Sequence, residues 1–564
     1  MPQDAFTLRH LCRELNNIFA GGKINKIVMP SPDSVVFTVY TKGRIDRFLI
    51  SALPSMPGIG ITTKDARVFD FPPFCQLLRK HLLGATINSV ELVGFDRIVK
   101  ISLTPSKEFF DQADKVLFVE LMGRYSNIIL TENGKVLGGN RGINMYDNGV
   151  RTLFTGHDYV FPPSNGKLLP NDPEIKKLFV NSDDLAETIV NHVQGVAKST
   201  AAWIVLSYAE RLNMDIHDVC LYVSQNPDDF FTYMNMRLYS EDIRPCIEYK
   251  DGEMCDVYAI PYGGGEYKFF DFLYVAEGYY FSEKQKNKEL ADLSQRANAI
   301  ISAKIKKAEK RLNILNQREK ETALAEDYRI KGELILSNIY KIRKGDGVLI
   351  CDNYYDGTKT EIFLDRSLSP SQNAETFFKK YNKLKRTENA LIPQLESAKK
   401  DMDYFFSVRD EISLCETADD YKAILNELRP VSDEKQKKKS DAPSARIYEK
   451  DGFTIRVGRS NIENDKIVSS ASRDSIWLHV KDYHSSHVII DVKSKTVPDY
   501  IIKFGAELSA YYSKCRGESK AEVVYTMRKF VKKPAGAKPG FVTYDNFKSV
   551  VVTPNKHEEF IKAD

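Results

Sequence analysis

The strongest chemical signal in this sequence is a basic and aromatic stretch near its end. Between residues 514 and 538, eight lysines and arginines oppose two glutamates, and aromatic residues lie in and beside the stretch. Cations neutralise phosphates and aromatic faces stack on bases, so this composition is typical of an RNA-binding surface. The sequence therefore predicts RNA contacts from Tyr512, Lys514, Lys529, Lys532, Lys533 and Lys538.

A solubilising basic face is the alternative explanation for this stretch. We favour RNA because the whole chain carries a formal charge of only +4, so the excess of cations is concentrated here. Residues 532–540 are rich in proline and glycine, which predicts a loop that presents its lysines outward. A second lysine-rich run at 435–439 is more simply explained as solvated charge in a linker.

A group of histidines precedes the basic stretch. Trp477 and His479 share one face of an expected strand, and His484 and His487 follow closely. A metal site would need converging ligands, and apart from Asp482 no cysteine or acidic cluster supports one. We expect buried or hydrogen-bonded histidines, with stacking on RNA as the second interpretation.

The sequence offers no convincing catalytic centre. It contains no G-x-S-x-G, Walker or H-E-x-x-H pattern, so we expect a non-enzymatic protein without metal or cofactor. Eight scattered cysteines form no C-x-x-C pair, which favours reduced thiols. No apolar run approaches the roughly 20 residues that span a bilayer, and residues 1–6 lack the features of a secretory signal. We expect a cytoplasmic protein that does not enter membranes.

The elements that position these residues begin with an α+β segment. A chain of 564 residues with 42% hydrophobic residues predicts about three or four domains with packed cores. Within residues 1–170 the apolar spacing predicts a helix at Phe6–Phe19, followed by short strands and a second helix. These further elements are the strands Ser34–Tyr40, Asp46–Ser51, Ile98–Thr104, Val116–Met122 and Asn127–Leu130, and the helix Phe74–Leu83.

Residues 171–282 change to a helical pattern with connecting strands. Two expected helices, Ala186–His192 and Lys198–Leu212, are joined by Val193–Ala197, whose glycine permits a tight turn. This apolar-Gly-apolar turn is the helix-hairpin-helix pattern, in which amides and a helix N-terminus can face a phosphate. An ordinary helical hairpin is the alternative.

Residues 283–432 show heptad spacing in two distant places. The first series is Ile301, Ile305, Ala308, Leu312 and Leu315, and the second is Leu391, Leu395, Ala398, Met402 and Phe405. Such spacing keeps one apolar seam facing a partner helix, so we expect a long antiparallel coiled coil. A Gly/Tyr/Asp-rich insert at Gly345–Leu364 forms its middle module, and Pro393 should kink or fray the second helix. A plain helical bundle is the alternative.

The remaining chain reads as a linker and a compact α/β domain. Residues 433–443 have linker composition, and the domain covers 444–564. Strands are expected at Arg446–Gly458, Trp477–Val480 and His487–Val492, with a helix at Pro498–Cys515.

Five C-terminal runs resemble the RNA-binding domain of the NFACT family. Asp451–Asn461 resembles its "DG-x-x-I-x-VGRN" opening, and Asp474–Asp482 resembles "DLWFHVKD". Ser486–Ile490 is similar to "GSHVVI", Ala510–Lys514 to "AYYSKAR", and residues 531–540 to "VKKPKGAKPG". The resemblance adds further RNA-contacting residues to the basic stretch: Arg459, Trp477, His479, Lys481 and His487. The family's Pro-Gly pair before Ser-His is His484-Ser485 here, which puts that loop's geometry in doubt.

The N-terminal half also resembles the NFACT family, and the order of the segments agrees. Gly94–Ile98 matches its Asp-Arg motif, and Glu120–Leu130 resembles "E-I-M-G-x-x-S-N-I-I-L". The resemblance implies an α+β multidomain protein: a glycosylase-like NFACT-N domain, a helix-hairpin-helix, the coiled coil and the NFACT-R domain. It also implies tRNA-binding residues at Asp96, Arg97, Glu120, Met122 and Arg124.

The function implied by the resemblance is ribosome-associated quality control of the RqcH and NEMF type. Such a factor binds the large ribosomal subunit through rRNA while it still carries peptidyl-tRNA. It recruits tRNA, with alanyl-tRNA implied for bacterial members, for template-independent tailing of the nascent chain, which marks that chain for degradation. A small RNA-binding helper protein is a further implied partner.

The sequence disfavours two other classes of function. Some relatives carry fibronectin-binding names, but the absence of a signal and of a wall anchor disfavours a surface adhesin. The related DNA glycosylases use an N-terminal proline and a neighbouring glutamate. Here Pro2 is followed by Gln3, which cannot act as a carboxylate acid or base, so glycosylase activity is disfavoured.

Overall fold

The computed structural model describes residues 4–63, 72–106, 113–142, 151, 153–180, 182–263, 265–429, 445–492 and 496–562. Two compact units divide the chain, Met1–Asn287 and Lys288–Asp564. The expected linker 433–443 and the residues Pro2 and Gln3 lie outside the described residues. Within the described ranges, no helix is long and apolar enough to cross a membrane.

The first unit contains a nine-stranded antiparallel sheet in its described part, with strand order β4-β3-β2-β1-β5-β6-β7-β8-β9. The apolar face of helix α1 (Ala5–Phe19) packs on this sheet, and Asp4 caps the helix by accepting from Thr7 N. The expected helix and strands are confirmed. Helix α2 is Pro73–Leu82, and the strands are β1 Lys23–Ser31, β2 Ser34–Thr41, β3 Arg44–Leu53, β4 Met56–Ile61, β5 Thr86–Leu92, β6 Ile98–Thr104, β7 Lys115–Glu120, β8 Asn127–Glu132 and β9 Lys135–Gly139.

A group of helices and a small sheet complete the first unit. The expected helix-hairpin-helix is α5 and α6, joined by a turn in which Gly195 has a φ of 75°. The small sheet has the order β11-β10-β12. The helices are α4 Ile175–Phe179, α5 Leu185–His192, α6 Lys198–Leu212, α7 Ile216–Gln225 and α8 Pro227–Leu238, and the strands are β10 Cys246–Lys250, β11 Glu253–Tyr258 and β12 Glu266–Phe269.

Two long antiparallel helices follow, as the heptad spacing predicts; α9 (Leu273–Thr322) starts in the first unit and continues into the second, and α11 (Pro370–Ser413) lies wholly in the second. Helix α9 begins before residue 283, and helix α11 begins with a capping box at Ser369. Ile301 and Ile305 pack in one core with Val408, and Leu315 packs in another with Leu391. Pro393 lies inside α11, which is one continuous helix across it.

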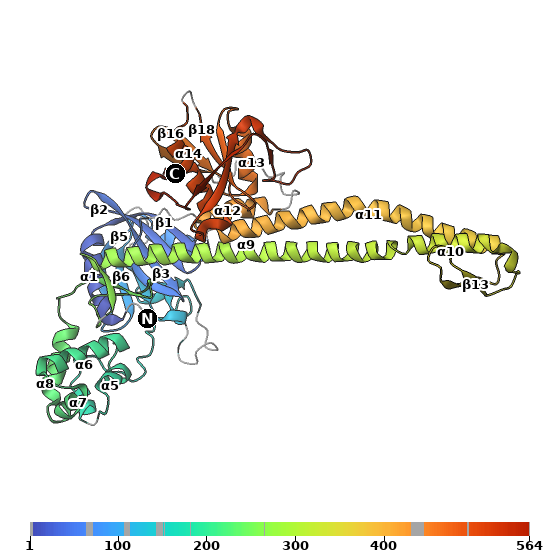
Figure 1. Ribbon diagram of the computed structural model, residues 1–564. Coiled ribbons are helices and arrows are strands. Elements are labelled where there is room, and N and C mark those ends of the chain that lie inside the picture. The colour runs from blue at the N-terminus through green and yellow to red at the C-terminus, as the bar shows by residue number, and fades with distance from the viewer. Residues whose placement is uncertain are drawn as a thin grey trace. The chain divides into compact units, whose positions relative to one another are not determined.

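A small module joins the two long helices, and a short helix follows them. Figure 1 shows α10 and β13 at one end of the α9–α11 pair. The expected insert is a hairpin of two strands, whose residues Leu349 and Ile362 pack on α10. These elements are α10 Ala325–Ser337, β13 Val348–Asp352, β14 Lys359–Phe363 and α12 Ala418–Glu427.

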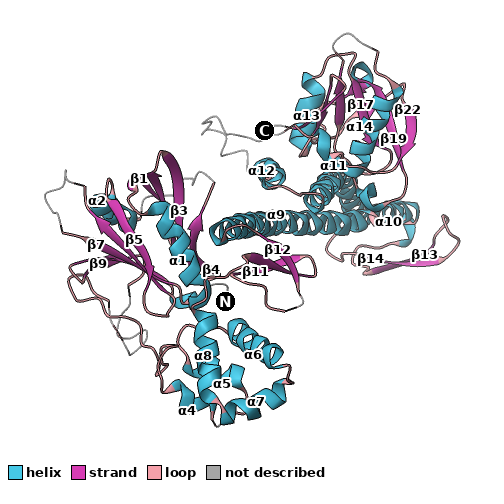
Figure 2. Ribbon diagram, turned by 90° about the vertical axis from the view of Figure 1, so that its left-hand side faces the viewer, coloured by secondary structure: helices cyan, strands magenta, loops and turns pink. Residues whose placement is uncertain are grey.

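The C-terminal domain, residues 445–562, is an α/β layer structure. Its described residues form a six-stranded antiparallel sheet with the order β15-β16-β18-β17-β19-β22. Figure 2 shows α13 (Asn461–Ser470) and α14 (Asp499–Tyr511) on either side of this sheet. The remaining strands are β15 Arg446–Lys450, β16 Phe453–Val457, β17 Ile476–Val480, β18 Val488–Asp491, β19 Ala521–Met527, β20 Val531–Lys532, β21 Thr543–Tyr544 and β22 Lys548–Val552.

Helices on both faces mean that alternate residues of one strand are buried on opposite sides. On β17, Leu478 packs in the core beside α14, whereas Trp477 packs in a separate core beside α13. A central strand covered on both faces has no side that faces solvent. This arrangement decides the role of several residues expected to contact RNA.

Candidate nucleic-acid interface

The sheet register of the first unit brings two expected tRNA-binding segments together. Asp96 and Arg97 immediately precede β6, and Glu120 ends β7. Because Ile98 pairs with Glu120 across the two strands, the turn before β6 and the chain after β7 are neighbours. Gly94 in that turn has a φ of 59°, a conformation that glycine adopts without strain.

A cavity of about 320 Å³, here called the N-terminal cavity, lies where these segments meet the helix-hairpin-helix turn. It gathers two carboxylates, two cations, small polar groups and backbone, which suits a polar ligand such as RNA. The residues that line it are Asp4, Asp96, Arg97, Met122, Pro163, Ser164, Asn165, Lys167, Gln194, Gly195, Val196 and Ala197.

Asp96 is oriented by hydrogen bonds from both sides of the cavity. Its Oδ1 accepts from the backbone of Arg97 at 2.7 Å, and its Oδ2 accepts from Gln194 Nε2 at 2.8 Å. The turn approaches so closely that a Cβ on Gly195 would lie 2.1 Å from the carbonyl oxygen of Phe95. The helix-hairpin-helix turn therefore packs directly on the Asp-Arg segment and fixes its carboxylate.

A second carboxylate occupies the start of helix α6. Asp4 accepts from Ala197 N at 3.3 Å and from Thr200 Oγ1 at 2.5 Å, in addition to capping α1. An acid near a helix N-terminus satisfies amides that have no partner within the helix. Ala197 N, one of the amides that the turn could offer to a phosphate, is thus satisfied by the protein itself.

Glu120, expected to contact tRNA, is instead a buried structural residue. Its side chain is only 1% exposed and accepts from Arg151 Nη2 at 2.7 and 2.6 Å and from the Tyr159 hydroxyl at 2.8 Å. Burial raises the pKa of Glu120, while the bonds from Arg151 act in the opposite direction. Met122 lines the cavity, whereas Arg124 is exposed outside it, beside the ring of Tyr125.

Three residues expected to contact RNA belong to the core of the C-terminal domain. Trp477 is 0%, His487 2% and Tyr512 3% exposed. The Trp477 ring lies parallel to His479, with centroids 5.6 Å apart, and the Tyr512 hydroxyl is 2.8 Å from that of Tyr448. Rings with so little exposed surface cannot stack on a base in this conformation, so the assignment of Trp477 and Tyr512 as RNA contacts is corrected to packing, and stacking by His487 is excluded.

The two inner histidines also contribute no positive charge at neutral pH. Burial lowers the pKa of His479 to about 4 and lowers that of His487 well below its usual value. Desolvation disfavours the charged form of an imidazole, so both rings are neutral. They can donate or accept hydrogen bonds, but they cannot neutralise phosphate.

Several of the expected RNA-binding cations already have acidic partners. Acids on α11 and in α12 face the C-terminal domain: Lys514 lies 2.8 Å from Asp410, Lys538 2.5 Å from Asp401, and Arg459 3.5 Å from Asp420. Lys533 pairs with Asp465, and Lys481 with Glu522. In the described part of the chain, the exposed Lys529 and Lys532 have no ion-pair partner, which leaves them available to phosphate.

Sequence reasoning missed the residues that complete both regions. Gln194, Lys167 and Asp4 join the N-terminal cavity, and Arg446 pairs with Asp420 at 2.7 Å. The glycine turn was a usable signal for the first group, but no spacing in the sequence shows that this turn packs on Asp96.

The loop that carries His484-Ser485 in place of the family's Pro-Gly pair is held by a left-handed residue and a side-chain hydrogen bond. Asp482 adopts the left-handed conformation with a φ of 61°, so neither His484 nor Ser485 needs glycine's freedom. The Ser485 hydroxyl accepts from Val480 N at 3.1 Å and closes the loop. Among the described residues, no group of three or more histidines, cysteines and acids could hold a metal ion.

Comparison with known proteins gives the same organisation. Residues 4–444 match the NFACT N-terminal and middle domains, and residues 445–546 match the NFACT protein RNA binding domain. The chain is 32% identical to Rqc2 homolog RqcH from Bacillus subtilis, covering 98% of each chain. It is 30% identical to Rqc2 homolog RqcH from Streptococcus suis, covering 100% of each.

Among solved structures, the N-terminal part of the fibronectin/fibrinogen-binding protein from Streptococcus suis is 24% identical to this chain. The match covers 50% of this chain and 99% of that one, with a TM-score of 0.41, too low to carry an argument. The two domain matches cover nearly the whole sequence in the expected order. The chain therefore belongs to the NFACT family, and its C-terminal domain is the RNA-binding domain of that family.

Proposed function

We propose that this protein is a ribosome-associated quality-control factor that acts by positioning RNA. It binds large ribosomal subunits that carry peptidyl-tRNA and recruits a tRNA, alanyl-tRNA in our proposal, for template-independent tailing of the nascent chain. Family membership, relatives named Rqc2 homolog RqcH and an RNA-binding domain support the quality-control function. A factor that works on ribosomes would act in the cytoplasm.

The N-terminal cavity is the observation that carries the tRNA part of this proposal. Arg97 can fork onto a phosphate or a guanine edge, and Asp96 can accept from a base amine. The hydrogen bond from Gln194 holds the Asp96 carboxylate in place, so less ordering is needed when RNA binds. Met122 adds an apolar contact in the same cavity.

We propose that the protein catalyses no reaction of its own. Asp96 and Asp4, the two acids of the N-terminal cavity, are both hydrogen-bonded to neighbouring groups, as positioning residues would be. Peptide-bond formation would remain with the ribosome, and this protein would supply the choice of tRNA. Specificity for one tRNA would come from the shape and polarity of its binding surface.

The test combines Asp96→Ala with Arg97→Ala in the full chain. We expect tRNA to be lost from the purified protein while co-sedimentation with large subunits remains, because the substitutions remove the polar contacts of the cavity only. Arg44→Ala, which removes a 57% exposed side chain outside the cavity, serves as the control. Unchanged recovery of tRNA by the double variant would show that the cavity is not the tRNA site.

A further inference from the structure

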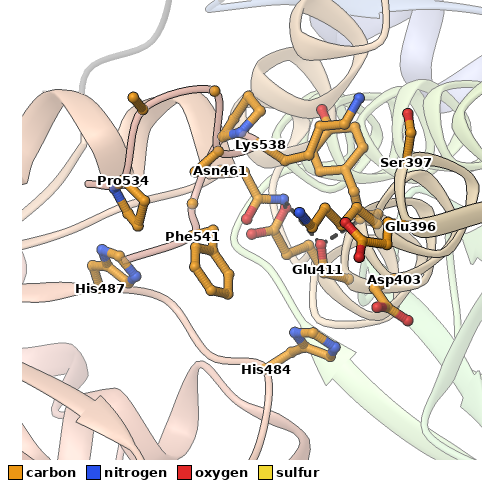
Figure 3. Close-up of a pocket in the computed structure, with 18 of the residues that line it drawn as sticks. Glu396, Ser397, Asp403, Glu411, Asn461, His484, His487, Pro534, Lys538 and Phe541 are labelled. Carbon is orange, nitrogen blue, oxygen red and sulfur yellow. Dashed lines mark hydrogen bonds between the residues drawn. The ribbon is translucent and has the colours of Figure 1, made fainter. Parts of the chain in front are cut away.

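A second and larger cavity, here called the C-terminal cavity, lies inside the second unit. Its volume is about 550 Å³, within the usual range for pockets that bind small molecules. Helix α11, the loop 534–541 and the turn between β17 and β18 form most of it, and Asn461 of α13 and His479 of β17 complete the lining. Figure 3 shows His487, Pro534 and Phe541 on one side, facing Glu396, Asp403 and Glu411 of α11 on the other.

The walls of this cavity are fixed by specific contacts. Asn461 Nδ2 donates to Glu411 at 3.1 Å, and Gly540 N donates to Asp465 at 3.2 Å. A Cβ on Gly540 would lie 2.0 Å from the side-chain oxygen of Asn461, so the loop approaches as closely as only glycine permits. The ion pair between Lys538 and Asp401 ties the same loop to α11. Specific contacts therefore hold the cavity in its shape.

The polar groups inside are unusual because several are buried and electrically neutral. His479 and His487 are neutral imidazoles, and burial raises the pKa of Glu411 well above its usual value. His487 is 2% exposed, and its Nδ1 has no hydrogen-bond partner among the described residues. A buried polar atom without a partner costs free energy, which a ligand with a matching group would recover.

The rim supplies exposed carboxylates and an exposed ring. Glu396 and Asp403 are exposed on the α11 side, and ionised carboxylates only accept hydrogen bonds. Phe541 is 57% exposed at the cavity, and aromatic side chains of this kind stack on unpaired bases. The exposed His484 adds a second ring beside it.

We propose that the C-terminal cavity receives one unstacked base of single-stranded RNA, and that it favours adenine, cytosine and guanine over uracil. The first three bases carry an exocyclic amino group that can donate to the carboxylates, and uracil has none. A planar heterocycle also matches the neutral imidazoles and the Phe541 ring. A lysine side chain would also pair with the carboxylates, but it has no ring that could stack on Phe541. The inference rests on the RNA-binding function proposed above.

The test uses the four ribonucleosides, because they lack the phosphate that would bind the basic surface. Saturation-transfer NMR with the full chain should show transfer to the base protons of adenosine, cytidine and guanosine. Uridine should bind roughly tenfold more weakly, the factor that corresponds to about 1.4 kcal/mol. Absence of transfer from every nucleoside, or equal binding of uridine, would overturn the proposal.

Matched variants test whether the nucleosides bind in the C-terminal cavity. Phe541→Ala should abolish transfer, whereas Phe547→Ala, which removes a similarly exposed ring outside the cavity, should leave it unchanged. Glu396→Gln should reduce the preference against uridine, and Glu449→Gln should not. Transfer that survives Phe541→Ala, or a lysine-rich peptide that binds in place of the nucleosides, would refute the base site.

A parallel measurement of tRNA binding by the wild-type chain distinguishes failure of the base site from failure of the proposed function. If tRNA binds but the nucleosides do not, the base site is wrong and the proposed function stands. If the wild-type chain binds no tRNA, the proposed function itself fails.

Discussion

Two carboxylates at adjacent strand ends of the same sheet, Asp96 before β6 and Glu120 at the end of β7, differ in role because they differ in burial. Asp96 is half-buried, lines a cavity and is held by Gln194, so it can still meet a ligand. Glu120 is 1% exposed and saturated by Arg151 and Tyr159. An acid enclosed with its cation stabilises the local fold, since either partner alone would be an uncompensated buried charge.

Substitution of Glu120 by alanine should destabilise the first unit strongly. The change leaves the guanidinium of Arg151, 7% exposed, without its partner, a loss of roughly 3–5 kcal/mol in the free energy of unfolding. Thermal unfolding followed by circular dichroism measures the effect. Arg124→Ala, on an exposed side chain, and Asp96→Asn should change the melting temperature little. A Glu120→Ala protein as stable as wild type would contradict this structural role.

The buried His487 should make the stability of the second unit depend on pH. In the unfolded chain a histidine has a pKa of about 6.5, whereas burial lowers the pKa of His487 in the folded chain. Below about pH 6.5 the unfolded state therefore binds the extra proton, and the free energy of unfolding falls as the pH falls. The loss continues until the pH reaches the depressed folded pKa.

The measurement is the unfolding free energy of wild type and His487→Gln between pH 7 and pH 4. Carboxylates titrate in the same range, so the relevant quantity is the difference between the two proteins. We expect wild type to lose more stability on acidification, by about 1.4 kcal/mol for each pH unit between the two pKa values. Parallel curves would mean that His487 is protonated as easily in the folded state.

At the scale of elements, the two ends of the long helix pair differ in the side chains that they present. Near the C-terminal domain, acids of α11 and α12 pair with its cations, as in Asp410 with Lys514 and Asp420 with Arg446. At the far end, the hairpin and the turn that follows α10 expose large apolar side chains: Tyr340 is 77%, Ile350 67% and Phe363 72% exposed. Apolar side chains exposed together mark a surface for a partner.

Shortening the helix pair should therefore separate folding from ribosome binding. We expect replacement of residues 322–386 by a short Gly/Ser linker to leave both units folded, because the Leu315–Leu391 contact and the acidic partners of the C-terminal domain remain. Association with large subunits should weaken, measured by co-sedimentation. Tyr340→Ser with Phe363→Ser, on exposed side chains, should reproduce the defect without shortening. Wild-type co-sedimentation of both variants would refute a docking role.

At the scale of the whole molecule, the charges nearly balance, with 81 basic and 77 acidic residues. The charge that matters for RNA is thus the part that the protein itself does not neutralise. Lys538 and Lys533 already have acidic partners, whereas Lys529 and Lys532 have none within the described residues. Counterion release on RNA binding should depend mainly on the second pair.

A salt titration of RNA binding by the full chain tests this division. Each phosphate contact contributes roughly 0.7–0.9 to the slope of log affinity against log salt, so Lys529→Ala with Lys532→Ala should lower the slope by about twice that amount. Lys533→Ala with Lys538→Ala should lower the slope less. These two lysines are already paired with protein carboxylates, so they release fewer counterions when they bind phosphate. Equal slopes for wild type and the first double variant would place the RNA surface elsewhere.

The sequence alone determined the elements and the family. Heptad spacing located the seam of α9 and α11, because a repeat of 3.5 residues can bury only one face of a helix. Apolar periodicity located α1, because its buried residues recur at helical spacing. Local sequence patterns are enough to predict an element when residues close in sequence determine its conformation.

Only the tertiary structure decided which of the singled-out residues face a ligand. A strand pattern shows that Trp477 and Leu478 point to opposite faces, but not that helices cover both. Spacing likewise does not show that Gln194 would reach Asp96, 98 residues away in sequence, or that Asp401 and Asp410 would neutralise expected RNA-binding lysines. These outcomes depend on contacts between distant segments. Such contacts are settled by packing and charge pairing in the folded chain, which no local period of the sequence encodes.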